Sequence, residues 1–250
     1  VLGSIGFTVL LEIKAYIKNR IPNFRFSLFT KVTTVTYLVI LIMGVLGILM
    51  IEGHGVFAHE SWHKTLFYAM FQSVTTRSAG LETFDVAQFS DATNLLMGAL
   101  MFIGSSPSSV GGGIRTTTFA IIILFVINYK PNAEKSSIKV FNREIHNQDI
   151  QRSFAVFCIA IMLTFLGMFI IILSEGSHIE FVKIYFEIMS AFGTCGLSTG
   201  ITSQLSNVSK VVLMVLMFIG RVGLISFIIM ISGNREPSKY HYPKERIQIG

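Results

Sequence analysis

The sequence predicts an all-α polytopic membrane protein that contains tandem repeats. Of its 250 residues, 52% are hydrophobic and only 14% are charged, whereas soluble domains have about 25% charged residues. Two pairs of segments also match at one common spacing: Ser78–Leu81 matches Thr194–Leu197, and Leu100–Gly104 matches Leu216–Gly220. Because both pairs keep this spacing, we interpret the chain as two copies of one membrane unit.

The basic residues gather in three polar segments, whereas the loops between them are acidic. The three segments hold 14 of the 20 Lys and Arg residues: Lys14, Lys18, Arg20, Arg25, Lys31, Lys130, Lys135, Lys139, Arg143, Arg152, Arg235, Lys239, Lys244 and Arg246. This asymmetry follows the positive-inside rule, so we expect these segments to face the cytoplasm. Membrane topology therefore accounts for the net charge of +6, and nucleic-acid binding is not expected.

The first repeat, residues 32–130, begins with the apolar segment Val32–Ile51, whose 20 residues can cross a bilayer. Trp62–Ser73 is also apolar, but its 12 residues extend only about 18 Å as a helix and cannot cross. Such a helix enters the membrane and returns, and its exposed backbone is tolerated only beside protein or a wet cavity. We therefore predict a pore helix and a return loop between two membrane helices.

The second spanning segment of this repeat, Ala92–Tyr129, is too long for one helix, because it would extend about 57 Å. Its stretch Gly104–Gly113 contains one proline, four glycines and four serines, which predicts a break within the membrane. We interpret this glycine-rich loop as a mobile gate, since a helix kink does not need ten residues. No Lys-Ser/Thr pair follows the glycines, so a phosphate-binding loop is excluded.

The second repeat, residues 153–232, follows the same course. Ser153–Leu173 is its first span, Ile179–Phe192 its pore helix, and Asn207–Ser232 an unbroken second span. Together the copies predict membrane–pore–membrane (M1-P-M2) repeats around a central ion pore.

The remaining segments are assigned to an upstream repeat and to the cytoplasm. Gly3–Phe7 weakly resembles Gly220–Leu224, as the remnant of another repeat would. The chain also starts within an apolar segment, so we expect it to be a fragment. The assignments are residues 1–31 for the end of an upstream repeat (its M2 half) and a cytoplasmic loop, residues 131–152 for a second cytoplasmic loop, and residues 233–250 for a cytoplasmic tail.

The two return loops carry the candidate ion-binding filter. Backbone carbonyls there would replace the hydration shell of a large monovalent cation, and glycine lets the backbone leave the usual φ/ψ regions close to the ion. The alternative is that Gly80 and Gly196 merely cap short helices; their match in two copies favours a filter. The candidate filter residues are Thr76, Arg77, Ser78, Ala79, Gly80, Thr194, Cys195, Gly196 and Leu197, with the carbonyls of Ser78, Ala79, Gly80, Thr194, Cys195 and Gly196 as the ligands of K⁺.

Three arginines within apolar surroundings need separate explanations. Arg77 would repel a cation in the filter, so we expect it to turn away and pair with Glu82 or Glu187. Arg221 lies near the centre of an apolar helix, where it costs about 2.5–3.5 kcal/mol; we expect it to face the pore and stabilise or bar the loop, with snorkelling as the alternative. Arg115 is interpreted as an ordinary interfacial anchor.

The candidate gate residues are Gly104, Ser105, Ser106, Pro107, Ser108, Ser109, Val110, Gly111, Gly112, Gly113 and Arg221.

No sequence feature resembles a nucleophile–base pair or a metal-hydrolase helix, so we do not expect an enzyme. His54, His59 and His63 lack a carboxylate or cysteine at metal-binding spacing and are interpreted as solvated. Cys158 and Cys195 are interpreted as a helix filler and a small filter residue, not as a disulfide. A polytopic membrane enzyme or an ABC-type permease is a distant alternative.

Thr75–Leu81, the glycine-rich loop and Phe218–Gly223 together resemble the Ktr/Trk/HKT superfamily of potassium transporters, most closely the KtrB-type membrane subunits. The resemblance covers essentially the whole chain and implies four M1-P-M2 repeats, of which this chain holds the last two and the end of the second. It implies that Gly80 and Gly196 are the third and fourth filter glycines. It also implies that Gly104–Gly113 is the intramembrane gating loop and that Arg221 is the basic residue below the filter.

The same resemblance implies how the protein works and with which partners. It implies selective potassium uptake across the bacterial plasma membrane through a homodimer with one pore per subunit. A KtrA-like ring of nucleotide-binding subunits would sit on the cytoplasmic side, so that the nucleotide lies on the partner and this chain carries no cofactor. Sodium is typical as an activator in Ktr systems. The alternative within the superfamily is a Trk-type transporter coupled to H⁺ or Na⁺.

Overall fold

The computed structural model describes residues 2–19, 25–53, 55–58, 60–128, 138–141, 143–176, 178–224 and 226. The helices are α1 (Leu2–Ile5), α2 (Phe7–Asn19), α3 (Leu28–Glu52), α4 (Trp62–Thr75), α5 (Asp91–Phe102), α6 (Thr116–Asn128), α7 (Asn147–Glu175), α8 (Phe181–Phe192) and α9 (Asn207–Val222), with 3-10 turns η1 (Val86–Gln88) and η2 (Ile201–Ser203). A short antiparallel hairpin, β1 (Lys139–Val140) and β2 (Arg143–Glu144), precedes α7. The predicted tail, residues 233–250, and His54, His59, Arg20, Lys130 and Lys135 lie outside the described residues.

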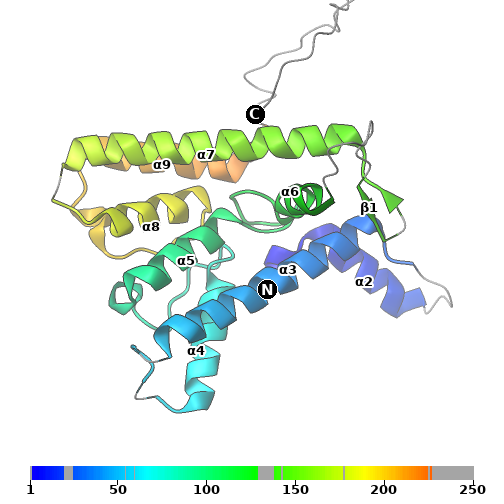
Figure 1. Ribbon diagram of the computed structural model, residues 1–250, viewed down its shortest axis with the longest axis horizontal. Helices are drawn as coiled ribbons and strands as arrows, with labels where there is room; N and C mark the ends of the chain where they lie inside the picture. The colour runs from blue at the N-terminus through cyan, green and yellow to red at the C-terminus, as the bar shows by residue number, and fades with distance from the viewer. Residues whose placement is uncertain are drawn as a thin grey trace, which may run out of the picture.

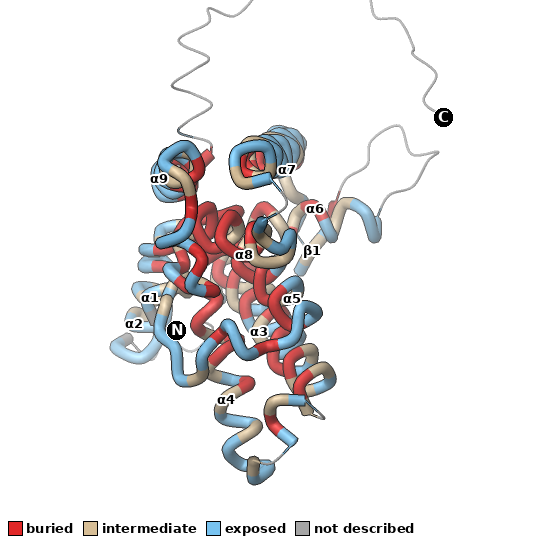
Figure 2. The backbone as a smooth tube through the Cα atoms, turned by 90° about the vertical axis from the view of Figure 1, so that its left-hand side faces the viewer, coloured by how far each residue is buried: buried red, intermediate tan, exposed pale blue. Residues whose placement is uncertain are grey.

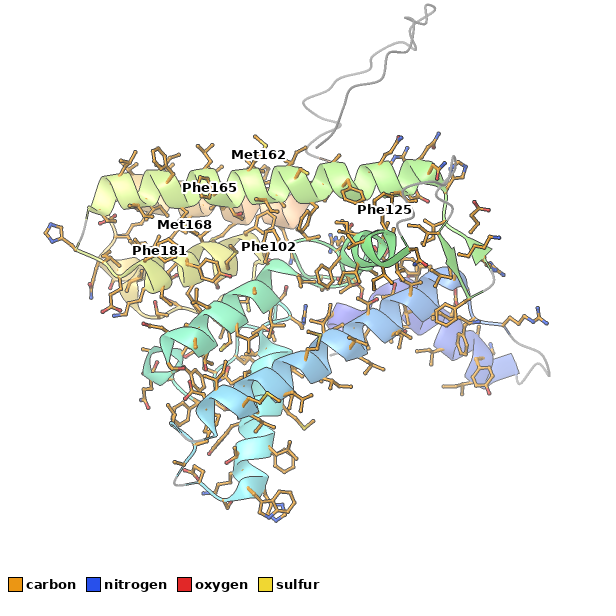
Figure 3. All side chains as sticks on the ribbon, in the orientation of Figure 1. Phe102, Phe125, Met162, Phe165, Met168 and Phe181 are labelled. Carbon is orange, nitrogen blue, oxygen red and sulfur yellow. The ribbon has the colours of Figure 1, made fainter. Side chains whose placement is uncertain are left out.

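Two helices, α3 and α7, are long and apolar enough to cross a membrane, with 25 and 29 residues. Only 28% of the most apolar window of each helix is buried, so large apolar side chains cover their outward faces. Met162 of α7 points away from the body of the molecule (Figure 3) and is 69% exposed. An apolar surface of this extent is stable against lipid rather than water.

The two short apolar helices, α4 and α8, match the predicted pore helices, with 14 and 12 residues. Helix α8 packs against α5, α7 and α9 in the most deeply buried part of the molecule (Figure 2). Helix α4 packs mainly on α3, and its first turns project from the body. One core cluster combines Ile48, Met97 and Met101 of the first repeat with Phe186 and Cys195 of the second. The two repeats therefore share a common core.

The predicted break in the second span of the first repeat is present. Helix α5 ends at Phe102 and α6 begins at Thr116. The chain between them leaves and returns at nearly the same place. Ile103 and Ile114 form a parallel bridge, and the Ile114 N–H donates to the Phe102 carbonyl (3.1 Å). Helices α5 and α6 are thereby separated by a closed loop (Figure 1).

The prediction of an unbroken second span from Asn207 to Ser232 is wrong. Helix α9 ends at Val222, and Gly223 has a φ of +89°. Gly6, which corresponds to Gly223 in the weak match between the N-terminal segment and the last repeat, likewise separates α1 from α2 with a φ of +100°. Left-handed glycines of this kind end helices, and the apolar character of the sequence concealed the helix end.

A carboxylate at the end of each long helix, buried at Glu52 and half-buried at Glu175, caps the helix that spans back. Glu52 of α3 accepts hydrogen bonds from the Ser90 N–H (2.9 Å), the Ser90 hydroxyl (2.7 Å) and the Thr93 hydroxyl (2.6 Å) at the start of α5. Glu175 of α7 accepts from the Ser206 N–H (2.8 Å) and the Ser209 hydroxyl (2.6 Å) at the start of α9. These contacts fix the angle between the two helices that enclose each pore helix.

Candidate functional site

The two candidate filter turns have the same backbone conformation. Ser78 and Gly80 have φ values of +61° and +66°, and Thr194 and Gly196 have values of +48° and +95°. Residues with side chains rarely adopt a positive φ, so its occurrence at equivalent positions of both copies marks a specialised turn rather than a simple helix end. The residue between each pair has no positive φ, and such alternation turns successive carbonyl oxygens toward one side.

The two turns lie directly beside each other. A Cβ added to Gly80 would overlap the Cys195 carbonyl oxygen. The Ser78 hydroxyl donates to the Gly193 carbonyl (3.0 Å), and the Cys195 thiol donates to the Thr75 carbonyl (3.1 Å). Residues more than a hundred positions apart thus form one continuous site, which sequence reasoning could only infer from the repeat.

The carbonyls that were expected to bind the cation have no competing partner. None of those six oxygens accepts a hydrogen bond from any residue in the described part of the chain. The carbonyls that follow them are paired: Leu81 accepts from the Thr75 hydroxyl and Leu197 from the Ser190 hydroxyl, both at 2.6 Å. Nearly all buried backbone carbonyls in proteins accept a hydrogen bond. Six neighbouring carbonyl oxygens without such a donor are therefore suited to coordinate a cation.

Two predicted filter residues serve a different purpose. The side chains of Thr76 and Leu197 are each 1% exposed. The Thr76 hydroxyl donates to the Ser73 carbonyl (2.7 Å) of its own pore helix. These side chains anchor the turns in the core, whereas Ala79 and Gly196 lie at the exposed edge of the site.

Arg77 turns away from the filter as expected, but the predicted carboxylate partner is wrong. Its guanidinium is buried and donates to the carbonyls of Leu100, Ile103 and Gly104. Glu187 instead accepts hydrogen bonds from residues 198, 199 and 202, just beyond the second filter turn. The C-terminal end of α5 attracts the Arg77 guanidinium. The last carbonyls of the helix lack partners within it and carry the negative end of the helix dipole.

The glycine-rich loop, Gly104–Gly113, lies against both filter turns. The Gly112 N–H donates to the Thr194 hydroxyl (2.9 Å). A Cβ added to Gly111 would lie 2.6 Å from the Ser78 hydroxyl oxygen, and one added to Gly112 would lie 2.6 Å from that of Thr194. A Cβ at either position would be too close to these hydroxyls, so glycine allows the loop to pack directly against both candidate filter turns.

Two arginines hold the loop by its carbonyl oxygens. Arg221 at the end of α9 donates to the Val110 carbonyl, which is the contact with the loop that the sequence led us to expect. Arg115 was predicted to be an interfacial anchor, and this is wrong: it donates to the Gly111 carbonyl (2.6 Å) and more weakly to that of Ser106 (3.5 Å). A guanidinium carries several N–H donors and no acceptor, so both arginines can donate to loop carbonyls: that of Gly111, a buried residue, and that of Val110, an exposed one.

The N-terminal segment also braces the loop, which sequence reasoning missed. The Ser106 N–H donates to the Ser4 carbonyl and the Phe7 N–H donates to the Ser108 carbonyl, both at 3.0 Å. The Ser4 hydroxyl donates to the Arg77 carbonyl (3.0 Å). The only sequence signal was the weak resemblance of residues 3–7 to the end of the last repeat.

A carboxylate lies at the outer mouth of the filter. Glu82 follows the first filter turn, is exposed, and has a pKa above its ordinary value because of partial burial and the nearby Asp85 carboxylate. The backbone N–H of Ser198, which follows the second filter turn, partly offsets this by favouring the charged form. Glu82 thus lies near the start of the segment that follows the second turn.

Two short apolar helices, the paired turns that follow them and the glycine-rich loop packed against these turns define a polytopic α-helical membrane protein. The chain belongs to the TrkH family of cation transport proteins, whose family model matches residues 1–240. Both the all-α membrane fold and the Ktr/Trk membership that the sequence predicted are confirmed.

Relatives of the same family match along the whole chain. Ktr system potassium uptake protein D of Bacillus subtilis is 46% identical over 250 residues, which cover 100% of this chain and 55% of that protein. Ktr system potassium uptake protein B of the same organism is 34% identical over 253 residues, with the same coverage. The chain therefore spans about half the length of the curated relatives it matches.

A solved structure supports the fold. The crystal structure of the potassium transporter TrkH from Vibrio parahaemolyticus aligns with a TM-score of 0.72 over 92% of this chain and 49% of that chain, at 18% sequence identity.

Proposed function

We propose that the protein carrying this chain takes up K⁺ selectively across the bacterial plasma membrane. The ion would lose its water to the carbonyls of residues 78–80 and 194–196, in a pore completed by two further repeats. The observation that carries the proposal is the pair of adjacent turns with repeated positive φ and six unpaired carbonyls. The potassium uptake named for both Bacillus subtilis relatives adds support.

The glycine-rich loop would be the gate of this pore. It lies beneath the filter and is held by the guanidinium groups of Arg115 and Arg221. Its movement would require these hydrogen bonds to break, so the loop is a two-state element whose populations a partner can bias. We assign that role to a cytoplasmic, KtrA-like ring of nucleotide-binding subunits beneath a homodimer, as the relatives' membership of a Ktr system suggests.

Sodium is proposed as an activator of uptake, as is typical of Ktr systems. The alternative is a Trk-type protein that couples uptake to H⁺ or Na⁺. Uptake measured with and without Na⁺, and with the proton gradient collapsed, separates these possibilities.

A substitution at the second filter glycine tests the proposed function. Gly196→Ser should lower the preference for Rb⁺ or K⁺ over Na⁺ by about tenfold, which corresponds to about 1.4 kcal/mol. There is space for the side chain, because the added Cβ would lie 3.8 Å from the Gly80 Cα, but the φ of +95° strains any residue with a Cβ. The measurement is ion uptake in cells that lack their own potassium uptake systems.

Gly200→Ser is the matched control. Gly200 also has a positive φ, +86°, and an added Cβ would meet nothing within 4 Å, yet it lies outside the filter turns. It should lose a similar amount of stability and keep its ion preference. Equal ion preference in the two variants would contradict the assigned filter.

A further inference from the structure

Two adjoining cavities lie where the membrane helices begin on the basic side of the molecule. The first, about 380 Å³, is lined by Arg25, Phe26, Leu28, Lys31, Phe141 and Arg143. The second, about 460 Å³, shares Leu28 with the first and continues between α3, α6 and α7. Figure 1 shows the β hairpin that carries Arg143 between the starts of α3 and α7.

The first cavity concentrates positive charge without a matching carboxylate. Arg25, Lys31 and Arg143 line it, and no acidic residue does so among those that the structure describes. None of the three forms an ion pair within the described ranges, where Lys64 pairs with Glu60 and Lys183 with Glu180. Three cations in one small cavity repel one another, so their arrangement favours an anion between them.

The chemistry of the three cations suits a phosphate group. Arginine forks and a lysine ammonium are the side chains that bind phosphate oxygens most strongly. The Lys31 ammonium lies 5.5 Å from the centroid of the Phe141 ring, and this contact holds it at the cavity wall. Arg25 and Arg143 are exposed, so a ligand can reach them without rearrangement.

The second cavity has an apolar wall, which argues against a free anion. Phe29, Val32 and Ile121 belong to this wall. The lining also includes the carboxylates of Glu144 and Asp149 and the guanidinium of Arg152. A ligand that fills both cavities therefore has a phosphate group at one end and a hydrocarbon chain at the other.

The position of the cavities along the helices corresponds to the level of lipid headgroups. Helix α3 begins at Leu28, capped by the Ser27 hydroxyl, which accepts from the Thr30 N–H (3.2 Å). Its apolar span starts there, so Arg25 and Lys31 flank the boundary between the membrane and the cytoplasm. Basic pockets at this boundary on the cytoplasmic side suit anionic lipid headgroups.

We propose that these two cavities form a binding site for one anionic phospholipid. Its phosphate lies among Arg25, Lys31 and Arg143, and one acyl chain lies in the groove lined by Phe29, Val32 and Ile121. The carboxylates of Glu144 and Asp149 belong to the lining of the groove, outside the phosphate site.

Native mass spectrometry of the detergent-purified full protein tests the site. Palmitoyl-oleoyl phosphatidylglycerol is titrated into the wild type and into a variant with Arg25→Gln, Lys31→Gln and Arg143→Gln. We expect the variant to bind this lipid about tenfold more weakly. The control variant carries Lys64→Gln, Lys183→Gln and Lys210→Gln, which removes the same charge elsewhere and should change binding less than twofold. Monodisperse elution and an unchanged melting temperature establish that each variant is folded.

Further arms separate the ligand classes. Ile121→Trp, which fills the groove, should weaken binding of the phosphatidylglycerol. Displacement of the lipid by millimolar inorganic phosphate would overturn the proposal in favour of a free-anion site. Equal binding of palmitoyl-oleoyl phosphatidylethanolamine would overturn recognition of an anionic lipid. Unchanged lipid binding in the triple-glutamine variant, with loss only of the regulatory subunit, would make the surface a protein-binding site instead.

Discussion

The guanidinium of Arg77 lies where α5 ends and the glycine-rich loop begins, although its backbone belongs to the filter sequence. Burying an unpaired charge is costly. Here Nη1 donates to backbone carbonyls rather than to a carboxylate, whereas Nε and Nη2 have no hydrogen-bond partner among the described residues. The expected partners, Glu82 and Glu187, followed from charge alone. The sequence does not predict that the end of α5 supplies carbonyls to Arg77, because this contact depends on how the two segments pack in the tertiary structure.

Replacing Arg77 should therefore destabilise the protein without changing its ion preference. Arg77→Met removes a charged donor from buried carbonyls, and we expect a loss of about 2–4 kcal/mol in the free energy of unfolding. Arg77→Lys keeps the charge and should lose less. The checks are thermal unfolding in detergent and the Rb⁺/Na⁺ uptake ratio. Lys183→Met is the control, because the Lys183 side chain is 40% exposed and forms only a surface ion pair with Glu180. A wild-type melting temperature for Arg77→Met would contradict this role.

At the scale of elements, the loop between α5 and α6 is defined by what holds it. Its break was predictable from composition, because ten residues rich in glycine, serine and proline cannot continue a helix. Its partners were not, with the exception of Arg221. Arg115 and the N-terminal segment bind backbone groups of the loop. Because every residue has a backbone carbonyl, the sequence does not show which carbonyls accept these hydrogen bonds.

Removing the Arg221 hydrogen bond should favour the open loop. Arg221→Ala removes one charge-assisted bond of about 1.5 kcal/mol, which shifts a closed–open equilibrium by about tenfold. Rb⁺ flux through proteoliposomes should rise. Lys210→Ala, on the same helix and away from the loop, should leave flux unchanged.

Deleting Ser105–Gly112 should have a larger effect in the same direction. The ends can be joined, because an added Cβ on Gly113 would lie 3.2 Å from the Gly104 Cα. Correctly folded protein with wild-type flux in both the deletion and Arg221→Ala would rule out the loop as the gate.

The two capping glutamates should differ in their contribution to stability. Glu52 is 1% exposed and accepts four hydrogen bonds, whereas Glu175 is half-buried. Glu52→Gln should cost about 2–3 kcal/mol, because the amide presents donors to donors, and Glu175→Gln about half as much. Chemical or thermal unfolding measures this, with Glu60→Gln as control, because the half-buried Glu60 forms only a surface ion pair with Lys64. The reverse order of effects would contradict the assignment.

On the scale of the whole molecule, the site lies between repeats and belongs to neither alone. The filter turns bond to each other, the loop of the first repeat rests on the Thr194 hydroxyl of the second, and Ser4 of the N-terminal segment reaches Arg77. Glu82 lies at the junction on the outer side. Sequence similarity between the copies indicated that such a junction exists, but not which groups meet there.

Uptake at low external potassium should depend on pH through Glu82. Because its pKa is raised, this carboxyl is protonated as pH falls at values above those of an ordinary glutamate, and the mouth then loses a negative charge that attracts cations. The apparent KM for Rb⁺ should rise on acidification toward pH 5. Glu82→Gln should have the higher KM already at pH 7 and a flatter profile, whereas Glu60→Gln should resemble the wild type. An unchanged pH profile in Glu82→Gln would contradict this role.

By itself, the sequence determined the membrane class, the two repeats, the two short apolar helices, the break at Gly104–Gly113 and the specialised turns at Gly80 and Gly196. These follow from local properties: apolar length against bilayer thickness, the backbone freedom of glycine, and a repeated motif. Only the tertiary structure decided the helix end at Gly223, the carbonyl partners of Arg77 and Arg115, and the bracing of the loop by residues 3–7. These contacts involve backbone groups of distant segments. Because all residue types have a backbone carbonyl, the residue type does not reveal which carbonyl accepts a hydrogen bond.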